Sequence, residues 1–250
     1  MTFKPVDYHN TKRGKLLLIY GPPGAGKSTF AARMAAAKEE GDAFAVVLDL
    51  EIGITEALKE AKGNSKLFDL SDPSPTMAND MTSFLRSIRN RDDVNMVVLD
   101  TLSELSWSIL QGLCGMKDPT LKIYGDRKKQ LRVILMELRN LAKVGKDIIV
   151  LTHETIGEVE GLPGHYAPAC PNRDRADIVG IFDLVGRLCV ATKSVAASTE
   201  LSPGEHYINL IKDPQHVSKC RYRIFNDDEL AVVSVETTED VANFIKKLKQ

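Results

Sequence analysis

Nine residues near the start of the chain combine glycines, a lysine and two hydroxyls at a spacing that suits phosphate binding. They fit the pattern G-x-x-x-x-G-K-[ST] and are called the P-loop below: Gly21, Pro22, Pro23, Gly24, Ala25, Gly26, Lys27, Ser28 and Thr29. Glycines let the main chain curl so that its N–H groups point at phosphate oxygens, and the following helix adds its positive end. Lys27 would bind the β- and γ-phosphates, and the Ser28 hydroxyl would ligate Mg²⁺. The pattern therefore predicts a nucleoside triphosphate site, the alternative being a glycine-rich turn.

Asp100 is the first acid expected to serve this loop. It follows the apolar run Met96–Leu99, which predicts a strand ending on a carboxylate. An acid in this position holds Mg²⁺ directly or through a water molecule in enzymes that cleave triphosphates. The alternative is that Asp100 caps a helix starting at Leu102, although Thr101 or Ser103 could do the same. Because the P-loop requires a metal ligand, we favour the metal role for Asp100.

Two further polar residues stand at predicted strand ends. Glu51 follows the apolar run 43–50, and its carboxylate could polarise the water that attacks the γ-phosphate. Glu51 and its neighbour Asp49 could instead be solvated charges. His153 closes the run 147–152 and could contact the γ-phosphate and respond to its loss, or be an ordinary surface histidine. Glu51 is therefore the candidate general base, and His153 the candidate sensor.

Lys219 and Arg221 place two cations on one face of a late predicted strand. Such cations can reach the nucleotide of a neighbouring subunit and stabilise charge that develops on the phosphate. Ordinary strand-surface charges are the alternative. The first interpretation predicts head-to-tail assembly, because each subunit then completes the site of the next.

Alternating strands and helices must position these groups over the first 150 residues. The apolar patterns predict strands at 16–20, 43–50, 66–70, 95–100 and 147–152, and the longest helix at 126–144. Alternation of this kind indicates a three-layer α/β fold with a mainly parallel sheet and helices on both faces. Ligands of such sheets lie at the carboxyl ends of the strands, where the P-loop, Glu51, Asp100 and His153 all fall.

The second part of the chain has a different pattern. Residues 156–177 are rich in glycine, proline and polar side chains, which predicts a long functional loop. Later strands are expected at 184–192, 206–212, 220–225 and 230–235, extending the sheet at one edge, and the alternation within 206–212 and 220–225 indicates antiparallel pairing. A final helix is expected at about 238–249. These assignments divide the chain into a lead-in (1–13), a core (14–236) and a C-terminal helix packed on the core (237–250).

Composition limits the environment and the partners. The formal net charge of -1 provides no general basic field, so any nucleic acid would have to bind a local patch. The chain has four widely spaced cysteines without C-x-x-C spacing, which indicates thiols of a reducing compartment. No signal peptide and no apolar run of about 20 residues is present, so the expected location is the cytoplasm, without a membrane partner.

Together these residues resemble the core of the RecA/Rad51 recombinases. Gly21–Thr29 matches their Walker A motif, and Val97–Thr101 matches their Walker B motif. Asp49–Glu51 is similar to their second strand, whose terminal glutamate is the catalytic base. Thr152-His153 stands at their γ-phosphate sensor, and Lys219-x-Arg221 is similar to their basic pair acting across the subunit interface. The likeness covers about residues 14–225. More specifically, the chain resembles compact phage-encoded ATPases that promote single-strand annealing.

This resemblance implies an ATPase that uses ATP and Mg²⁺, binds single-stranded DNA and takes part in recombination. It also implies a head-to-tail homo-oligomer, a single-strand binding protein as a further partner, and a host-cytoplasmic location for a phage protein. The family's two DNA-binding loops would lie at 112–125 and 156–177, with expected DNA contacts from Lys117, Lys122, Tyr166, Arg173 and Arg175. Histidine replaces the family's usual glutamine, and separate polymerisation and DNA-gateway domains are missing from the pattern.

Two other functions remain open at this point. A P-loop kinase or regulatory NTPase switch would act without DNA, and a kinase needs an arginine-rich lid over the donor phosphates. The arginines of 126–139 lie on a long predicted helix instead of a short lid. A non-hydrolysing interaction module would use ATP only as a structural ligand, and turnover in a Glu51→Gln variant would distinguish it.

Overall fold

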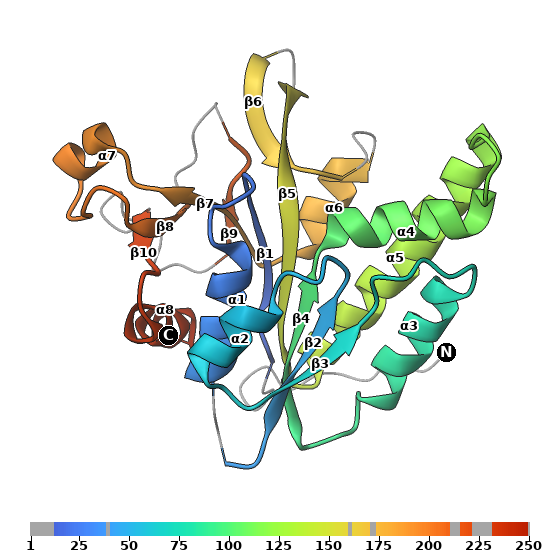
Figure 1. The fold of residues 1–250 in the computed structure, drawn as a ribbon, viewed down its shortest axis with the longest axis horizontal. Coiled ribbons are helices and arrows are strands. Elements are labelled where there is room, and N and C mark those ends of the chain that lie inside the picture. Colours follow the sequence, from blue (N-terminus) through green and yellow to red (C-terminus); the bar gives the residue numbers. More distant parts are fainter. Residues whose placement is uncertain are drawn as a thin grey trace.

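The computed structural model describes residues 13–38, 41–159, 162–170, 174–210, 216–221 and 232–249. Within these ranges a sheet of ten strands runs in the order β10-β8-β7-β1-β5-β4-β2-β3, with β6 paired to β5 and β9 paired to β7. Helices cover both faces of this sheet (Figure 1). The three-layer α/β fold predicted from the sequence is confirmed.

The parallel part of the sheet is built from apolar runs. Its strands are β1 (Leu16–Gly21), β2 (Phe44–Asp49), β3 (Ser65–Asp69), β4 (Val94–Asp100), β5 (Asp147–Val159) and β7 (Leu184–Val190). Every residue of β1 and β2 is buried, as expected for strands covered on both faces. The central strand β1 lies between β5 and β7 and is parallel to both. The P-loop that follows β1 is therefore placed at the middle of the sheet.

Two hydrophobic cores hold the layers together. One face carries α1 (Lys27–Ala37), α2 (Thr55–Ala61) and α8 (Thr238–Lys249), and the other carries α3 (Met77–Ser87), α4 (Leu102–Cys114), α5 (Leu121–Lys143) and α6 (Arg175–Ile181). Phe244 of α8 packs edge-on against Phe30 of α1, with ring centroids 6.3 Å apart. Among the described residues, no helix combines the length and the apolar character that crossing a membrane requires.

Short antiparallel strands extend the sheet beyond β7, as the sequence predicts. They are β8 (His206–Asn209), β9 (Lys219–Cys220) and β10 (Val232–Ser234). β8 pairs with β7 and β10, and β9 pairs with β7, all in antiparallel fashion. The predicted remainders of these strands at 211–212, 222–225 and 230–231 lie outside the described residues, as does most of the predicted lead-in. The domain boundaries at 13 and 236 stay a prediction.

The prediction of one long loop at 156–177 is wrong. β5 continues to Val159 and pairs with β6 (Leu162–Pro168), and α6 begins at Arg175. The hairpin of β5 and β6 rises beyond the carboxyl ends of the other strands (Figure 1). The sequence pattern does not indicate these two strands, because glycine and proline have a low strand propensity. Pairing across the hairpin overcomes this propensity in the fold.

Two smaller differences concern helices. The DNA-binding loop expected at 112–125 is shorter, because α4 extends to Cys114 and α5 already starts at Leu121, where the Thr120 side chain accepts a hydrogen bond from the Ile123 main chain. Lys122 therefore lies on a helix. The sequence pattern also gave no indication of α7 (Lys193–Ser198), which Thr192 caps in the same way.

Candidate nucleotide-binding site

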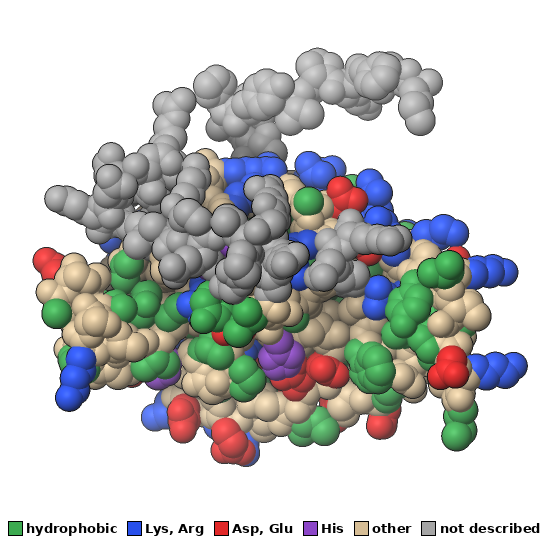
Figure 2. All heavy atoms as spheres, turned by 90° about the horizontal axis from the view of Figure 1, so that it is seen from above, with side chains coloured by type: hydrophobic (Ala, Val, Ile, Leu, Met, Phe, Trp, Pro, Cys, Tyr) green, Lys and Arg blue, Asp and Glu red, His purple; other side chains and the backbone are tan. Residues whose placement is uncertain are grey.

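The carboxyl ends of β1, β2 and β4 and the middle of β5, which lies between β1 and β4, bring the predicted groups together. Gly21 at the end of β1 is paired with His153 in β5, and Asp49 at the end of β2 is paired with Asp100 at the end of β4. β5 lies between β1 and β4, so His153 stands between the P-loop and Asp100. Seen from above, a histidine lies beside acidic side chains near the middle of this face (Figure 2). The predicted groups therefore lie side by side, but His153 does not end its strand as predicted, because β5 continues to Val159.

The P-loop main chain depends on its glycines. Gly24 and Gly26 have φ angles of 78° and 82°, in the left-handed region that other residues rarely adopt. A Cβ atom on Gly21 would lie 2.4 Å from the Leu188 carbonyl oxygen of β7. Gly26 is also the N-cap of α1, which begins at Lys27. The loop therefore presents main-chain N–H groups and a helix N-terminus to the same space, as a triphosphate requires.

Lys27 is buried at the base of this loop, with 7% of its surface exposed. Its Nζ donates to the Gly21 and Pro22 carbonyl oxygens at 3.1 and 3.0 Å. Burial lowers the pKa of Lys27, whereas the carboxylates of Glu51, Asp100 and Glu154 act in the opposite direction. Two neutral carbonyls are weaker partners than a phosphate, so the ammonium group is available for a charged ligand.

Ser28 and Asp100 form the candidate metal-binding pair. Ser28 Oγ donates to Asp100 Oδ2 at 2.7 Å. Asp100 is 1% exposed, and its Oδ1 has no hydrogen-bond partner among the described residues. Thr101 is the N-cap of α4 and accepts a hydrogen bond from the Glu104 main chain, so Asp100 is not needed as a cap. A hydroxyl and a carboxylate with an unsatisfied buried oxygen fit Mg²⁺, which takes oxygen ligands.

Burial raises the pKa of Asp100 to about 6, with Glu51 and Asp49 adding to the rise and Ser28 opposing it. Because this value lies above the ordinary 3.8, the metal-free fold binds the Asp100 proton more tightly than the unfolded chain does. Its stability is therefore expected to fall as pH rises from about 4 through 6. The ionised carboxylate costs at most about 3 kcal/mol at pH 7.

Asp100→Asn is thus expected to be more stable than the parent at pH 7 without Mg²⁺, and this advantage should vanish below about pH 4. Thermal unfolding of both proteins between pH 4 and 8 measures the difference. Addition of Mg²⁺ and nucleotide should stabilise the parent and leave the variant nearly unchanged. Equal stabilisation of both proteins would remove Asp100 from the metal site.

A polar network fixes Glu51 next to the P-loop. Asp49 Oδ1 accepts main-chain hydrogen bonds from Glu51 and Ile52, both at 3.0 Å, and so shapes the turn that presents Glu51. Glu51 Oε1 accepts from Thr101 Oγ1 at 2.5 Å and lies 2.8 Å from His153 Nε2. The Glu51 side chain is 28% exposed, whereas Asp49 is buried. Of these two acids, Glu51 is therefore the one that water and substrate can reach.

Two groups near this network are absent from the sequence prediction. Glu104 lies in the first turn of α4, and one ligand atom each of Glu51, Glu104 and His153 lies within 4.8 Å of the others. Its position four residues after Asp100 is the only sequence signal. Arg187 in β7 binds Glu154 at 2.9 and 3.3 Å, a pairing between separate strands that no local pattern indicates.

Lys219 and Arg221 lie away from the P-loop of their own chain. Lys219 pairs with Val185, near the start of β7, and its Nζ donates to the Val179 and Gly180 carbonyl oxygens at 3.1 and 3.0 Å. Arg221 binds Asp183 Oδ1 at 3.1 Å and the Gly180 carbonyl oxygen at 3.0 Å. Both cations thus have partners within the chain, and their role across a subunit interface stays a prediction.

The five residues expected to contact DNA do not lie together, and they differ in how exposed they are. Lys117 and Lys122 are exposed at the connection between α4 and α5. Tyr166 lies in β6, with the Arg187 guanidinium 3.9 Å from its ring centroid. Arg175 opens α6 and is 8% exposed, so it is not part of the accessible surface. Arg173 lies outside the described residues.

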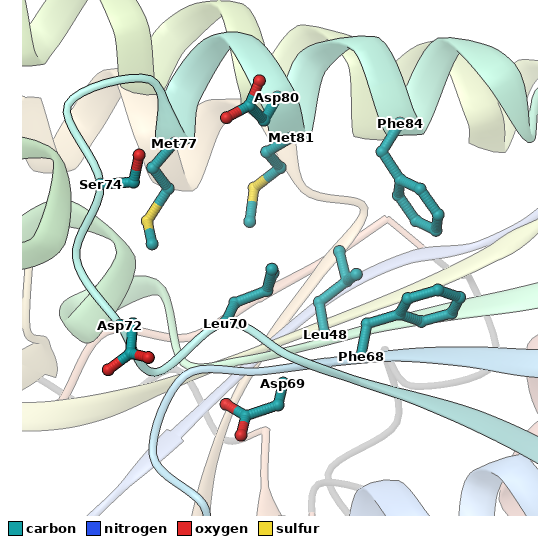
Figure 3. A pocket seen from close by; sticks show the side chains of 10 residues that line it. All are labelled: Leu48, Phe68, Asp69, Leu70, Asp72, Ser74, Met77, Asp80, Met81 and Phe84. Atoms are coloured by element: carbon teal, nitrogen blue, oxygen red, sulfur yellow. The ribbon is translucent and has the colours of Figure 1, made fainter.

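A cavity of about 360 Å³ lies elsewhere, between the edge strand β3 and α3 (Figure 3). Its wall is apolar and its rim acidic, and the side chains of Phe68 and Phe84 meet in it with ring centroids 4.8 Å apart. Three acids lie at the rim: Asp69, Asp72 and Asp80. Among the described residues, none of the predicted site residues lines this cavity. An acidic, apolar cavity is unsuited to a triphosphate, so it is separate from the nucleotide site.

Comparisons with known proteins agree with this geometry. The sequence model of the AAA domain family matches residues 13–222. The curated proteins give no match. Among solved structures, the chain is similar to a DnaB-like replicative helicase studied with its interactions with primase, at 17% identity and a TM-score of 0.52. The alignment covers 90% of this chain but 56% of the helicase chain, so the likeness concerns the fold alone. From the family match and the P-loop geometry together, we conclude that this chain belongs to the AAA domain family of P-loop ATPases.

Proposed function

We propose that the protein hydrolyses ATP with Mg²⁺ and uses this reaction on single-stranded DNA, promoting annealing during homologous recombination. The observation that carries the hydrolytic part is the contact of Glu51 with Thr101 and His153 beside the P-loop. The resemblance of the chain to RecA-type recombinases supports the DNA part of the proposal. Its more specific resemblance to compact phage-encoded ATPases supports a phage origin. A fixed, accessible carboxylate next to a triphosphate site is suited to activating water.

In the proposed reaction, Glu51 accepts a proton from the water whose oxygen attacks the γ-phosphorus. The bond between the γ-phosphorus and the bridging oxygen of the β-phosphate breaks, and ADP and phosphate leave. Lys27 and the main-chain N–H groups of the P-loop hold the phosphates. Ser28 and Asp100 would hold Mg²⁺, which neutralises the charge on the β- and γ-phosphates when bound. His153, whose Nε2 lies 2.8 Å from the Glu51 carboxylate, would respond to loss of the γ-phosphate.

The connection between α4 and α5 is the proposed DNA contact. Met116 and Leu121 are 104% and 89% exposed here, and Tyr124 is 41% exposed, next to Lys117 and Lys122. At the right-hand end of the face seen from above, hydrophobic and cationic side chains lie side by side (Figure 2). An aromatic ring among cations suits single strands, whose bases stack and whose phosphates are attracted by charge.

The proposed assembly depends on contacts between neighbouring subunits. Head-to-tail contact would bring Lys219 and Arg221 to the nucleotide of a neighbouring subunit, and both would have to exchange their present partners at Gly180 and Asp183. A ring or a filament satisfies this geometry equally. A single-strand binding protein is a further proposed partner.

We expect single-stranded DNA to raise the ATPase rate several-fold. A variant with Lys117→Glu and Lys122→Glu should lose this stimulation and its salt-sensitive DNA binding, because it places acids where phosphates would lie. The matched control, Lys59→Glu on α2 with Lys62→Glu at its C-cap, reverses two charges elsewhere and should be stimulated like the parent. A monomer that is insensitive to DNA and transfers phosphate to a small acceptor would instead support a kinase.

A further inference from the structure

The P-loop has two flanks, and only one carries the predicted catalytic groups. Asp100, Glu51 and His153 come from strands on the β5 side of β1, whereas β7 and β8 lie on the other side. A triphosphate whose γ-phosphate faces Asp100 and Glu51 must therefore place its nucleoside toward β8. The first residue of β8 is His206.

His206 lies directly against the P-loop. A Cβ atom on Gly26 would lie 2.9 Å from His206 Cδ2 and 3.2 Å from His206 Nε2. A notch of about 30 Å³, room for one water molecule, lies between this ring and two residues of α1, Thr29 and Arg33. Thr29 follows the Lys27–Ser28 pair along the loop, on the side where the α-phosphate and the sugar of a bound nucleotide would lie. The ring edge of His206 thus lies at the expected position of the sugar.

Glu236 fixes the orientation of this ring. Its Oε2 lies 2.8 Å from His206 Nδ1 and accepts from the His206 main-chain N–H at 2.9 Å. Several effects lower the pKa of Glu236, and the hydrogen bond from the His206 main-chain N–H is the largest of them. The lowered pKa keeps the carboxylate ionised, so that it can accept both hydrogen bonds. Arg33 holds the same segment by donating to the Val235 carbonyl oxygen at 2.8 Å. When Nδ1–H donates to Glu236, an uncharged imidazole has its Nε2 left as a hydrogen-bond acceptor.

We infer that His206 is a nucleoside-binding residue whose Nε2 accepts a hydrogen bond from a ribose hydroxyl of the bound nucleotide. This inference rests on the proposed nucleotide site and adds a sugar preference to it. No described hydrogen bond occupies Nε2, whereas Nδ1 is fixed, so the ring is oriented before the ligand arrives. A single net hydrogen bond of this kind corresponds to about a two- to tenfold preference for ribose over a sugar without hydroxyls.

The test compares Kd values of ATP and 2′,3′-dideoxy-ATP, both with Mg²⁺, for the parent and two variants. His206→Phe keeps a ring against Gly26 but lacks the acceptor, so its preference for ATP should fall to about one. His206→Gln restores an acceptor oxygen near the Nε2 position and should keep part of the preference. Thermal unfolding of all three proteins controls for folding, and the ratio of the two Kd values is insensitive to a general loss of affinity.

The outcomes separate this inference from the proposed function. A parent that binds neither nucleotide overturns both. A parent that binds ATP tightly, with a ratio that His206→Phe leaves unchanged, overturns only the role of His206. Equal weakening of both nucleotides by His206→Phe would also contradict it, because the ring would then contact the phosphates or merely support the loop. Loss of the ratio in His206→Phe, with partial retention in His206→Gln, supports the inference.

Discussion

Alanine at position 27 is expected to weaken ATP binding by about a hundredfold. The Lys27 ammonium is buried at the base of the P-loop, where its present partners are two main-chain carbonyls. Charge-assisted contacts to phosphate oxygens are stronger than these, and loss of such contacts costs up to about 3 kcal/mol of binding free energy. Calorimetry or displacement of a fluorescent nucleotide measures the change.

Lys59→Ala provides the matched control, since this lysine is exposed on α2 and pairs with Glu56 on the same helix at 2.6 Å. Its affinity for ATP should equal that of the parent. The Lys27→Ala fold should persist, because the carbonyls of Gly21 and Pro22 can bind water instead. ATP binding as tight as in the parent would show that the phosphates lie elsewhere, and the proposed site would have to be abandoned.

Glu51→Gln is expected to lower the turnover of ATP by about 10²- to 10⁴-fold, the usual contribution of a general base. Glutamine keeps an oxygen that can accept from Thr101, so the turn and the nucleotide affinity should be preserved. The amide cannot take a proton from water at neutral pH. Single-turnover hydrolysis together with the Kd of ATP distinguishes a loss of chemistry from a loss of binding.

Glu104→Gln is the matched control for this variant, since Glu104 offers a second carboxylate within 4.8 Å of the same cluster. Its turnover should change by less than about tenfold, because no described hydrogen bond joins the Glu104 carboxylate to Thr101 or His153, as those of Glu51 do. A large loss in Glu104→Gln with normal turnover in Glu51→Gln would transfer the base to Glu104. A parent without turnover would indicate a module that uses ATP only as a structural ligand.

The candidate site was largely predictable because each of its parts has a local signature. The P-loop has a fixed spacing, and Asp100 and His153 each close an apolar run that the structure shows as a strand. Strands of a parallel sheet end at a common edge, so order along the chain is enough to bring these residues together. The role of Thr101 was also within reach, because a hydroxyl before an apolar helix is a frequent N-cap.

Other parts depend on contacts between distant segments. The glycine- and proline-containing residues of β6 form a strand only because β5 supplies its hydrogen-bond partners. Arg175 looks like a loop cation in the sequence, yet α6 and its surroundings bury it. Long-range pairing outweighs the local propensity in both cases, and no short window of sequence contains the partner.

The sequence by itself determined the phosphate-binding loop, the strands that end beside it and the three-layer fold, because main-chain geometry and apolar periodicity are local properties. Only the tertiary structure decided that Asp49 shapes the turn while Glu51 faces the site, and that Glu104 joins its cluster. It also placed His206, 180 residues after Gly26, against the P-loop. Such neighbours follow from strand order and register across the sheet, which the packing of the whole chain sets.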